Sequence, residues 1–253
     1  MAAAFCYAIL QRRLSESGGR HSYFVPASQR EYKERKMVYV YALNVQDLPD
    51  PAEKPGAMND LWEDRRQKIL RYKFAEGRKQ SLGAGLLLKW VLQKHGSALK
   101  KLSYGPNGKP EAEGVFFNLS HSRQWVICTI GDVPLGCDVE EIAPVRDGIA
   151  ERFFTEKEVQ YLHCFEGAQR QEQFFRLWTL KESYMKMTGE GMSLALDRFE
   201  FNMDGKPTVK RDGKPCDCHV KEYELPGYKV AVCAEENKFT DTLQYVNVTE
   251  LLN

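Results

Sequence analysis

The sequence predicts an α+β fold built from two halves of similar content. Of the 253 residues, 43% are hydrophobic and 28% are charged, a balance typical of folded domains that bury a core. Segments with strand and helix patterns are mixed along the chain without strict alternation, which favours α+β over a doubly wound α/β sheet. Strands and helices of similar size occur in both halves, as expected of an internal duplication.

Residues 1–36 differ in character from the rest of the chain. They hold seven basic residues against three acidic ones, and their apolar opening precedes its positive charge, the reverse of a secretory signal. A β-branched and aromatic run starts at Val38, directly after Met37. We expect 1–36 to be a poorly ordered leader with Met37 as the natural start, or else a transit peptide. The remaining chain divides into an N-terminal half (37–131) and a C-terminal half (132–253).

The N-terminal half opens with a strand over 38–42. Asn59 or Asp60 is the expected cap of a helix that runs to Tyr72, and a second helical pattern covers 82–92. Residues 105–109 form a turn, because they combine Gly, Pro and Asn.

Three strands are expected next, followed by helices and short strands. The strands cover 115–121, 125–131 and 135–140, and we predict that they form an antiparallel meander. The later elements are helices within 153–162 and 172–187, then short strands around turns at Asp204-Gly205 and Asp212-Gly213.

Charge, hydropathy and cysteine content exclude several classes of protein. With 36 basic and 35 acidic residues the net charge is +1, which gives no general field for nucleic acid. No apolar run approaches the ~20 residues needed to cross a bilayer. Seven cysteines in a chain of this size favour free thiols in a reducing compartment. We therefore expect a cytoplasmic monomer that binds neither nucleic acid nor membranes.

Two carboxylates are predicted to share one face of a strand. Asp138 and Glu140 lie two positions apart, so both side chains point the same way. They repel each other unless a cation or solvent separates them. A solvent-facing strand edge is the plain interpretation, but the neighbours Leu135, Gly136 and Val139 favour a strand against the core and therefore a metal site.

Lys181 interrupts an apolar helix face. On a helix, Phe174, Trp178, Lys181 and Met185 fall within about 60° of one another. The Lys181 ammonium therefore needs an anionic partner, unless its four-carbon stem reaches the helix edge.

The adjoining face of this helix carries Glu182 and Lys186, four residues apart. Together with Lys181 it presents one carboxylate and two ammonium groups. That set suits a phosphate held beside a hard cation such as Mg²⁺.

Ser120 and His121 are neighbours on a predicted strand, so their side chains point to opposite faces and cannot form a nucleophile–base pair. We interpret them as hydrogen-bond donors to a bound anion, with a structural histidine as the alternative. The basic run over 65–79 is either a solvated helix face or a patch where Arg65, Lys68 and Arg78 bind a polyphosphate.

Several of these segments together resemble the 4′-phosphopantetheinyl transferases of the Sfp-like (surfactin-synthetase-activating) type, from Met37 nearly to the C-terminus. The similar motifs are Gly108–Pro110, the Ser-His-Ser motif within Phe117–Ser122, the Gly-x-Asp-x-Glu motif at Gly136–Glu140 and the Trp-x-x-Lys-Glu-Ser-x-x-Lys motif at Trp178–Lys186.

This resemblance implies transfer of the 4′-phosphopantetheine arm of coenzyme A to a serine of an apo acyl or peptidyl carrier protein, with release of adenosine 3′,5′-bisphosphate. It also implies a pseudo-twofold pair of α+β halves, each a small antiparallel sheet packed with helices, with the coenzyme between them. The implied Mg²⁺ ligands are Asp138, Glu140 and Glu182, and Lys181 and Lys186 would hold the pyrophosphate. The implied contacts to the other phosphates or the nucleotide are Arg65, Lys68, Lys109, Ser120 and His121.

Asp138, Glu182 and Lys186 are the expected catalytic residues, with Glu182 accepting the proton of the carrier serine. Two other functions use the same residues. A metal-dependent phosphohydrolase of a nucleotide or coenzyme A pyrophosphate would direct the three acids at water, and a non-enzymatic module would bind phosphorylated partners through its basic segment.

Overall fold

The computed structural model describes residues 37–97 and 102–252, and every structural statement below concerns these residues. The predicted leader, residues 1–36, lies outside them.

The first half is a strand, a long helix and a β-hairpin. Strand β1 (Tyr39–Asn44) pairs antiparallel with β5 (Trp125–Gly131), which pairs antiparallel with β4 (Phe116–Ser122). The long helix α4 (Ala75–Lys94) lies between β1 and the hairpin in sequence. The other edge of β1 pairs in parallel with β12 (Gln244–Val246), so the sheet order is β12-β1-β5-β4.

The second half repeats this topology. Strand β6 (Leu135–Glu141) is followed by the long helix α7 (Gly167–Thr188) and by the hairpin of β10 (His219–Leu225) and β11 (Tyr228–Ala234). As in the first half, the first strand pairs with the last, which gives the order β10-β11-β6. The prediction of an α+β fold with two similar halves is confirmed.

Shorter elements complete the two halves. They are η1 (Pro55–Met58), α3 (Glu63–Leu70), β2 (Ser103–Tyr104), β3 (Pro110–Glu111), α5 (Ile149–Phe153), α6 (Glu156–His163), η2 (Gly191–Ser193), η3 (Leu196–Arg198), β7 (Phe199–Asn202), β8 (Thr208–Arg211), β9 (Lys214–Pro215) and α8 (Val248–Leu252).

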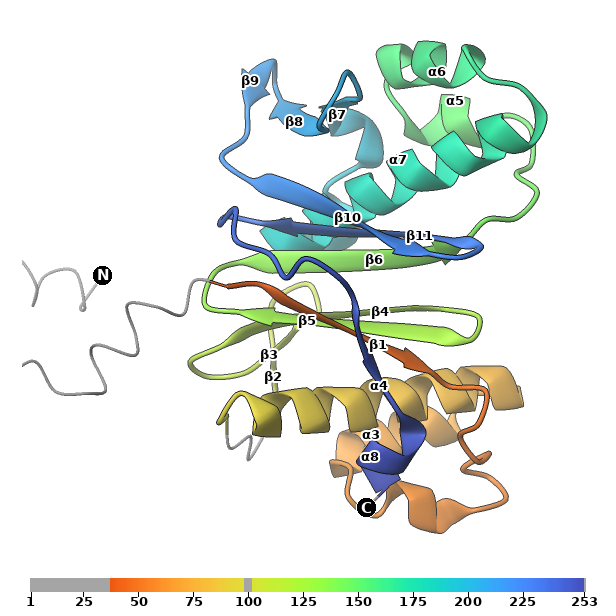
Figure 1. Cartoon of the computed structure of the whole chain (residues 1–253), viewed down its shortest axis with the longest axis vertical. Coiled ribbons are helices and arrows are strands. Elements are labelled where there is room, and N and C mark those ends of the chain that lie inside the picture. The colour runs from red at the N-terminus through yellow and green to blue at the C-terminus, as the bar shows by residue number, and fades with distance from the viewer. Residues whose placement is uncertain (1–36, 98–101, 253) are drawn as a thin grey trace, which may run out of the picture. The chain divides into compact units, whose positions relative to one another are not determined.

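The two sheets lie at the centre, with α4 on the outer face of the first and α7 on the outer face of the second (Figure 1). Alternation along each strand produces this layering. In β1, Val40 and Ala42 face the apolar core between the sheets, whereas Tyr41 and Leu43 face the core beneath α4. Strands buried on both faces therefore read as continuous apolar runs.

Two sequence expectations about helix starts are wrong. Asn59 and Asp60 lie in a turn after η1, and the N-cap of α3 is Trp62, which makes no side-chain capping bond. Glu63 and Asp64 occupy the first turn, where the positive end of the helix dipole favours them. Helix α4 starts at Ala75 rather than near Leu82, because its first turns are polar and carry no apolar periodicity.

The predicted meander is also wrong at its third strand. The chain leaves the first sheet after β5, and β6 pairs with β11 instead. Among the described residues, one edge of β6 therefore has no main-chain pairing, and this edge lies beside β4, the edge strand of the first sheet. The sequence patterns predicted the three consecutive strands correctly, but they did not show that the third strand pairs in the other sheet.

Candidate active site

A row of polar side chains on β4 joins the two halves. Asn118 Oδ1 accepts a hydrogen bond from the Cys137 amide (2.9 Å), Ser120 Oγ from the Val139 amide (3.4 Å) and Ser122 Oγ from the Glu141 amide (3.1 Å). These are alternate N–H groups on the free edge of β6, and buried main-chain donors need such acceptors. We call Asn118, Ser120 and Ser122 the seam row.

Asp138 lies at the centre of this seam. Its side chain is almost completely buried, and its Oδ1 accepts from Ser120 Oγ (2.7 Å) and from Lys186 Nζ (2.6 Å). Its second oxygen, Oδ2, is buried without a hydrogen-bond partner among the described residues. A buried carboxylate oxygen left unpaired is costly and calls for a ligand that the protein does not supply.

The charge of Asp138 acts on two further carboxylates, those of Glu140 and Glu182. Burial, followed by the charges of Asp138 and Glu182, raises the pKa of Glu140 to about 7, although Ser122 and Lys186 oppose the change. Burial and then the charge of Asp138 raise the pKa of Glu182 as well. The structure therefore brings the three predicted acids into electrostatic contact.

Helix α7 delivers Glu182 and Lys186 because Gly136 lets it approach β6 closely. A Cβ atom at Gly136 would overlap the main chain of α7 at Ser183 and Met187. Lys186 is 27% exposed at its side chain. Burial alone would lower its pKa, but neighbouring groups, with Asp138 first among them, together outweigh that effect and raise the pKa.

Lys109 fixes the same helix from the first half. Its ammonium donates to the main-chain carbonyls of Lys186 (2.7 Å) and Leu135 (3.0 Å), and burial lowers its pKa. As the structure stands, Lys109 ties the end of α7 to the start of β6, so its ammonium is already engaged.

A group of cations surrounds His121. The side chain of His121 is exposed on β4, yet the surrounding protein and then the charges of Lys186, Lys68 and Arg65 lower its pKa. Arg65 and Lys68 both come from α3, and burial lowers the pKa of each. The structure thus brings Arg65, Lys68, His121 and Lys186 together beside the carboxylates.

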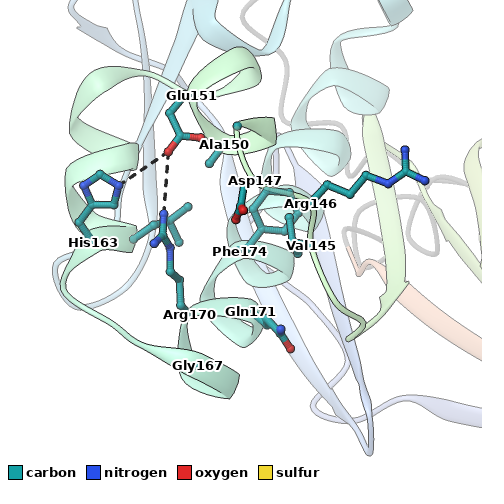
Figure 2. Close-up of a pocket in the computed structure, with 12 residues that line it drawn as sticks. Val145, Arg146, Asp147, Ala150, Glu151, His163, Gly167, Arg170, Gln171 and Phe174 are labelled. Carbon is teal, nitrogen blue, oxygen red and sulfur yellow. Dashed lines mark ion pairs between the residues drawn. The ribbon is translucent and has the colours of Figure 1, made fainter.

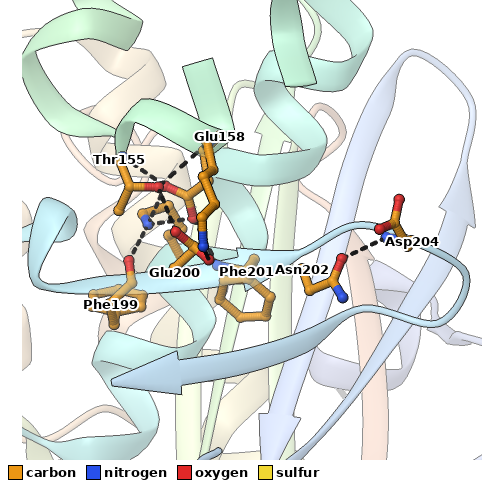
Figure 3. Close-up of polar contacts among 9 residues, drawn as sticks. Thr155, Glu158, Phe199, Glu200, Phe201, Asn202 and Asp204 are labelled. Atoms are coloured by element: carbon orange, nitrogen blue, oxygen red, sulfur yellow. Dashed lines mark hydrogen bonds and ion pairs between the residues drawn. The ribbon is translucent and has the colours of Figure 1, made fainter. Parts of the chain in front are cut away.

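Lys181 is not part of this cluster, which corrects the expectation that it holds a pyrophosphate. Its fully buried ammonium lies 2.7 Å from both oxygens of Glu158 and 2.7 Å from the carbonyl of Phe199. Figure 3 shows Glu158 among Thr155, Phe199 and Phe201, where it also accepts from the amides of Thr155 (2.9 Å) and Phe201 (2.8 Å). The anionic partner that the sequence required exists, but it is a protein carboxylate.

Arg78 is likewise engaged elsewhere. Its guanidinium forms a two-point ion pair with Asp50 (2.8 and 2.6 Å) and donates to the carbonyls of Tyr72 (3.0 Å) and Lys73 (2.8 Å). The hydrogen bond to Asp50 raises the pKa of Arg78. This arginine holds the connection between α3 and α4 and does not point its charge at the carboxylates.

Sequence reasoning missed the roles of Glu158, Asn118 and Ser122. The signal for Glu158 was present, because Thr155 and Glu158 form a capping box at the start of α6. No single-strand pattern identifies Asn118 and Ser122, because their partners lie on a strand of the other half.

The carboxylates are not arranged as a finished metal site. In the part of the chain that the structure describes, no group of three or more His, Cys, Asp or Glu side chains has a geometry that could hold a metal ion. Lys186 already donates a hydrogen bond to Oδ1 of Asp138. The unpaired Oδ2 is therefore the oxygen of this carboxylate that is available to a metal ion.

A pocket of about 440 Å³ lies elsewhere on the second half (Figure 2). Residues of α5, α6 and the first turns of α7 line it, and Glu151 pairs there with His163 (3.7 Å) and Arg170 (3.9 Å). Glu182 and Lys186 lie in the last turns of α7, so this pocket is separate from the carboxylates.

Comparison with known proteins shows to which family the chain belongs. The family model described as the 4′-phosphopantetheinyl transferase superfamily matches residues 134–233. The 4′-phosphopantetheinyl transferase Sfp of Bacillus subtilis (strain 168) is 31% identical over 222 residues, which cover 84% of this chain and 99% of that protein. The chain belongs to the 4′-phosphopantetheinyl transferase superfamily.

A second relative agrees with that assignment. The 4′-phosphopantetheinyl transferase psf-1 of Bacillus pumilus is 33% identical over 200 residues, 75% of this chain and 85% of that protein. The crystal structure of the Thermotoga maritima holo-[acyl-carrier-protein] synthase covers 40% of this chain and 62% of its own, with 26% identity and a TM-score of 0.35.

In this phosphopantetheinyl transferase the family match contains β6 and α7, and therefore Asp138, Glu140, Glu182 and Lys186. The seam row, His121 and the cations of α3 precede the matched range. None of the described helices is both long and apolar enough to cross a membrane.

Proposed function

We propose that this enzyme transfers the 4′-phosphopantetheine arm of coenzyme A to a serine of an apo acyl or peptidyl carrier protein and releases adenosine 3′,5′-bisphosphate. The observation that carries the site assignment is Asp138, whose buried Oδ2 is unpaired while its Oδ1 receives Lys186. A carboxylate and an ammonium side by side suit a diphosphate bound with a divalent ion.

The chemistry of these side chains fits Mg²⁺, which proteins usually bind through only one or two carboxylates together with phosphates of the substrate. Asp138, Glu140 and Glu182 would hold the ion through carboxylate oxygens, which Mg²⁺ prefers. The raised pKa values of Glu140 and Glu182 arise from burial and from the charge of Asp138, and a bound cation would remove that repulsion. When bound, Mg²⁺ neutralises charge that develops on the diphosphate.

The cations of the site would bind the rest of coenzyme A. Lys186, with its side chain partly open to solvent, would contact the diphosphate. Arg65, Lys68 and His121 would contact a further phosphate, because the two cations lie close enough to His121 for their charges to lower its pKa. The charges of Lys186, Arg65 and Lys68 would stabilise the leaving bisphosphate more than the intact coenzyme, which accelerates transfer.

Glu182 is the candidate that accepts the proton of the carrier serine. Burial, the larger cause of its raised pKa, would remain with a cation bound and moves the pKa of this carboxyl group towards neutral pH, where it can both accept and release a proton. The nucleophile belongs to the carrier protein, so the enzyme needs no activated serine or cysteine of its own.

The state of the cysteines bears on the cellular setting. All six cysteines among the described residues are free, which supports a reducing compartment such as the cytoplasm. The predicted monomer and the absence of membrane and nucleic-acid partners stay predictions.

The test is to incubate the enzyme with coenzyme A and Mg²⁺, with and without a panel of purified apo carrier proteins. Mass spectrometry should detect a phosphopantetheine adduct on a carrier, and bisphosphate release should depend on that carrier. Rapid breakdown of coenzyme A without any carrier would favour the phosphohydrolase instead.

A further inference from the structure

Ser120 and Ser122 make the same pair of contacts two residues apart. Ser120 accepts from the Val139 amide (3.4 Å) and donates to Asp138 Oδ1 (2.7 Å). Ser122 accepts from the Glu141 amide (3.1 Å) and donates to Glu140 Oε2 (3.0 Å). Each hydroxyl therefore bonds one acid of β6 and the amide of the residue that follows it.

The chemistry of a hydroxyl makes this arrangement directional. A serine has one proton to donate and two lone pairs to accept with. Because the amide of Glu141 can only donate, Ser122 must accept from it, and the single proton of Ser122 is left for Glu140. The hydroxyl thus fixes the carboxylate relative to the main chain of β6.

Asn118 shows which side-chain group is sufficient to connect β4 with the main chain of β6. Its Oδ1 accepts from the Cys137 amide (2.9 Å), and this row position faces no acid, because the β6 residue before Cys137 is Gly136, which has no side chain. An acceptor alone is enough to satisfy a β6 amide. The donors of Ser120 and Ser122 are extra, and both are directed at predicted metal ligands.

We infer that Ser122 is a positioning residue, which orients Glu140 for the metal of the transferase. The inference rests on the proposed function. It also assigns Ser120 the same task for Asp138, because the Ser120 proton is already given to that carboxylate. The ligands belong to the second half, but side chains of the first half set their orientation.

The experiment compares Ser122→Ala, Ser122→Thr and the matched seam variant Asn118→Ala. Calorimetric titration measures Mg²⁺ binding to each protein saturated with coenzyme A, without carrier. Thermal unfolding without Mg²⁺ reports folding separately.

Ser122→Ala is expected to weaken Mg²⁺ binding about tenfold, because outer-shell partners of metal ligands have effects of that order. Ser122→Thr, which keeps the hydroxyl, should stay within about twofold of the wild type. Asn118→Ala should lower the unfolding temperature while Mg²⁺ affinity is unchanged.

Three results would overturn the inference. They are wild-type affinity in Ser122→Ala, equal loss in Ser122→Thr and Ser122→Ala, and an equal loss in folded Asn118→Ala. A wild type that transfers the arm but binds no Mg²⁺ overturns the inference together with the metal part of the proposed function. A wild type that binds Mg²⁺ but modifies no carrier contradicts only the transferase, and the comparison among the variants still decides the role of Ser122.

Discussion

At the scale of single residues, Asp138 is the acid on which the contacts of the site converge. It lies at the seam, accepts from Ser120 and Lys186, and keeps one buried oxygen unpaired. The sequence predicted the shared face of Asp138 and Glu140, because alternation along a strand is a local property. It misplaced Lys181, because the partner that occupies this ammonium comes from α6 and cannot be read from α7.

Asp138→Asn should lower carrier modification by at least about 100-fold, the order expected when a charged group of the transition-state site is lost. The amide keeps the shape of the side chain but removes the charge that pairs with Lys186 and would bind the metal. Rates measured by mass spectrometry over a range of Mg²⁺ concentrations test this. Glu224→Gln, an exposed acid on β10, is the matched control and should retain the wild-type rate.

The raised pKa of Glu140 predicts that the stability of the protein depends on pH. This pKa is about 7 in the folded protein against an ordinary value of 4.5, so between these values the folded state binds a proton that the unfolded state has lost. Stability of the metal-free protein should therefore fall as pH rises from about 4.5 to 7, by at most about 3 kcal/mol from this group.

Urea unfolding in a chelator at pH 5 and pH 7.5 measures this change. Glu140→Gln cannot ionise, so its stability should fall less than that of the wild type over the same interval. Parallel pH profiles for the two proteins would contradict the assignment of the raised pKa.

At the scale of elements, α7 is held on both sides. Gly136 and Lys109 fix its last turns against β6, and the buried Lys181–Glu158 pair ties it to α6 and β7. The helix itself was predictable from its periodicity, as was α6, and strand patterns predicted β4 and β5. The pairing of β6 was not, because its free edge is satisfied by side chains of β4 rather than by a neighbouring strand.

Lys181→Met should destabilise the protein by about 3 to 5 kcal/mol, because it leaves the charge of Glu158 buried without a cation. Adding Glu158→Gln should recover part of that loss, since the amide oxygen still accepts from the Phe201 amide. Denaturant unfolding of the two single variants and the double variant measures the coupling.

The same variants separate a structural lysine from a ligand-binding one. Under conditions where Lys181→Met is folded, its KM for coenzyme A should stay within about twofold of the wild type, because the buried ammonium does not face the site. A large rise in KM in the folded variant would return Lys181 to the phosphate site.

At the scale of the whole molecule, the two halves share one topology, but the first half is not built from one continuous segment of chain. The similar content of the halves predicted the duplication. It could not predict that the last residues return to the first half, where β12 pairs with β1 and Val246 is buried in the core beneath α4. Three residues are too few for a strand pattern to stand out.

Removal of residues 244–253 should therefore destabilise the first half. Burial of Val246 alone contributes about 2 kcal/mol, and the deletion also leaves the outer edge of β1 unpaired and prone to association. Removal of 248–253 should cost less, because none of the described residues of α8 is buried. Thermal unfolding and light scattering of the two truncations should show this order.

Strands β12 and β4 lie at opposite edges of the first sheet, so the seam is far from the cut. The folded fraction of either truncation should consequently keep the Mg²⁺ dependence of the full chain, and a changed dependence would mean that the C-terminal segment also shapes the site.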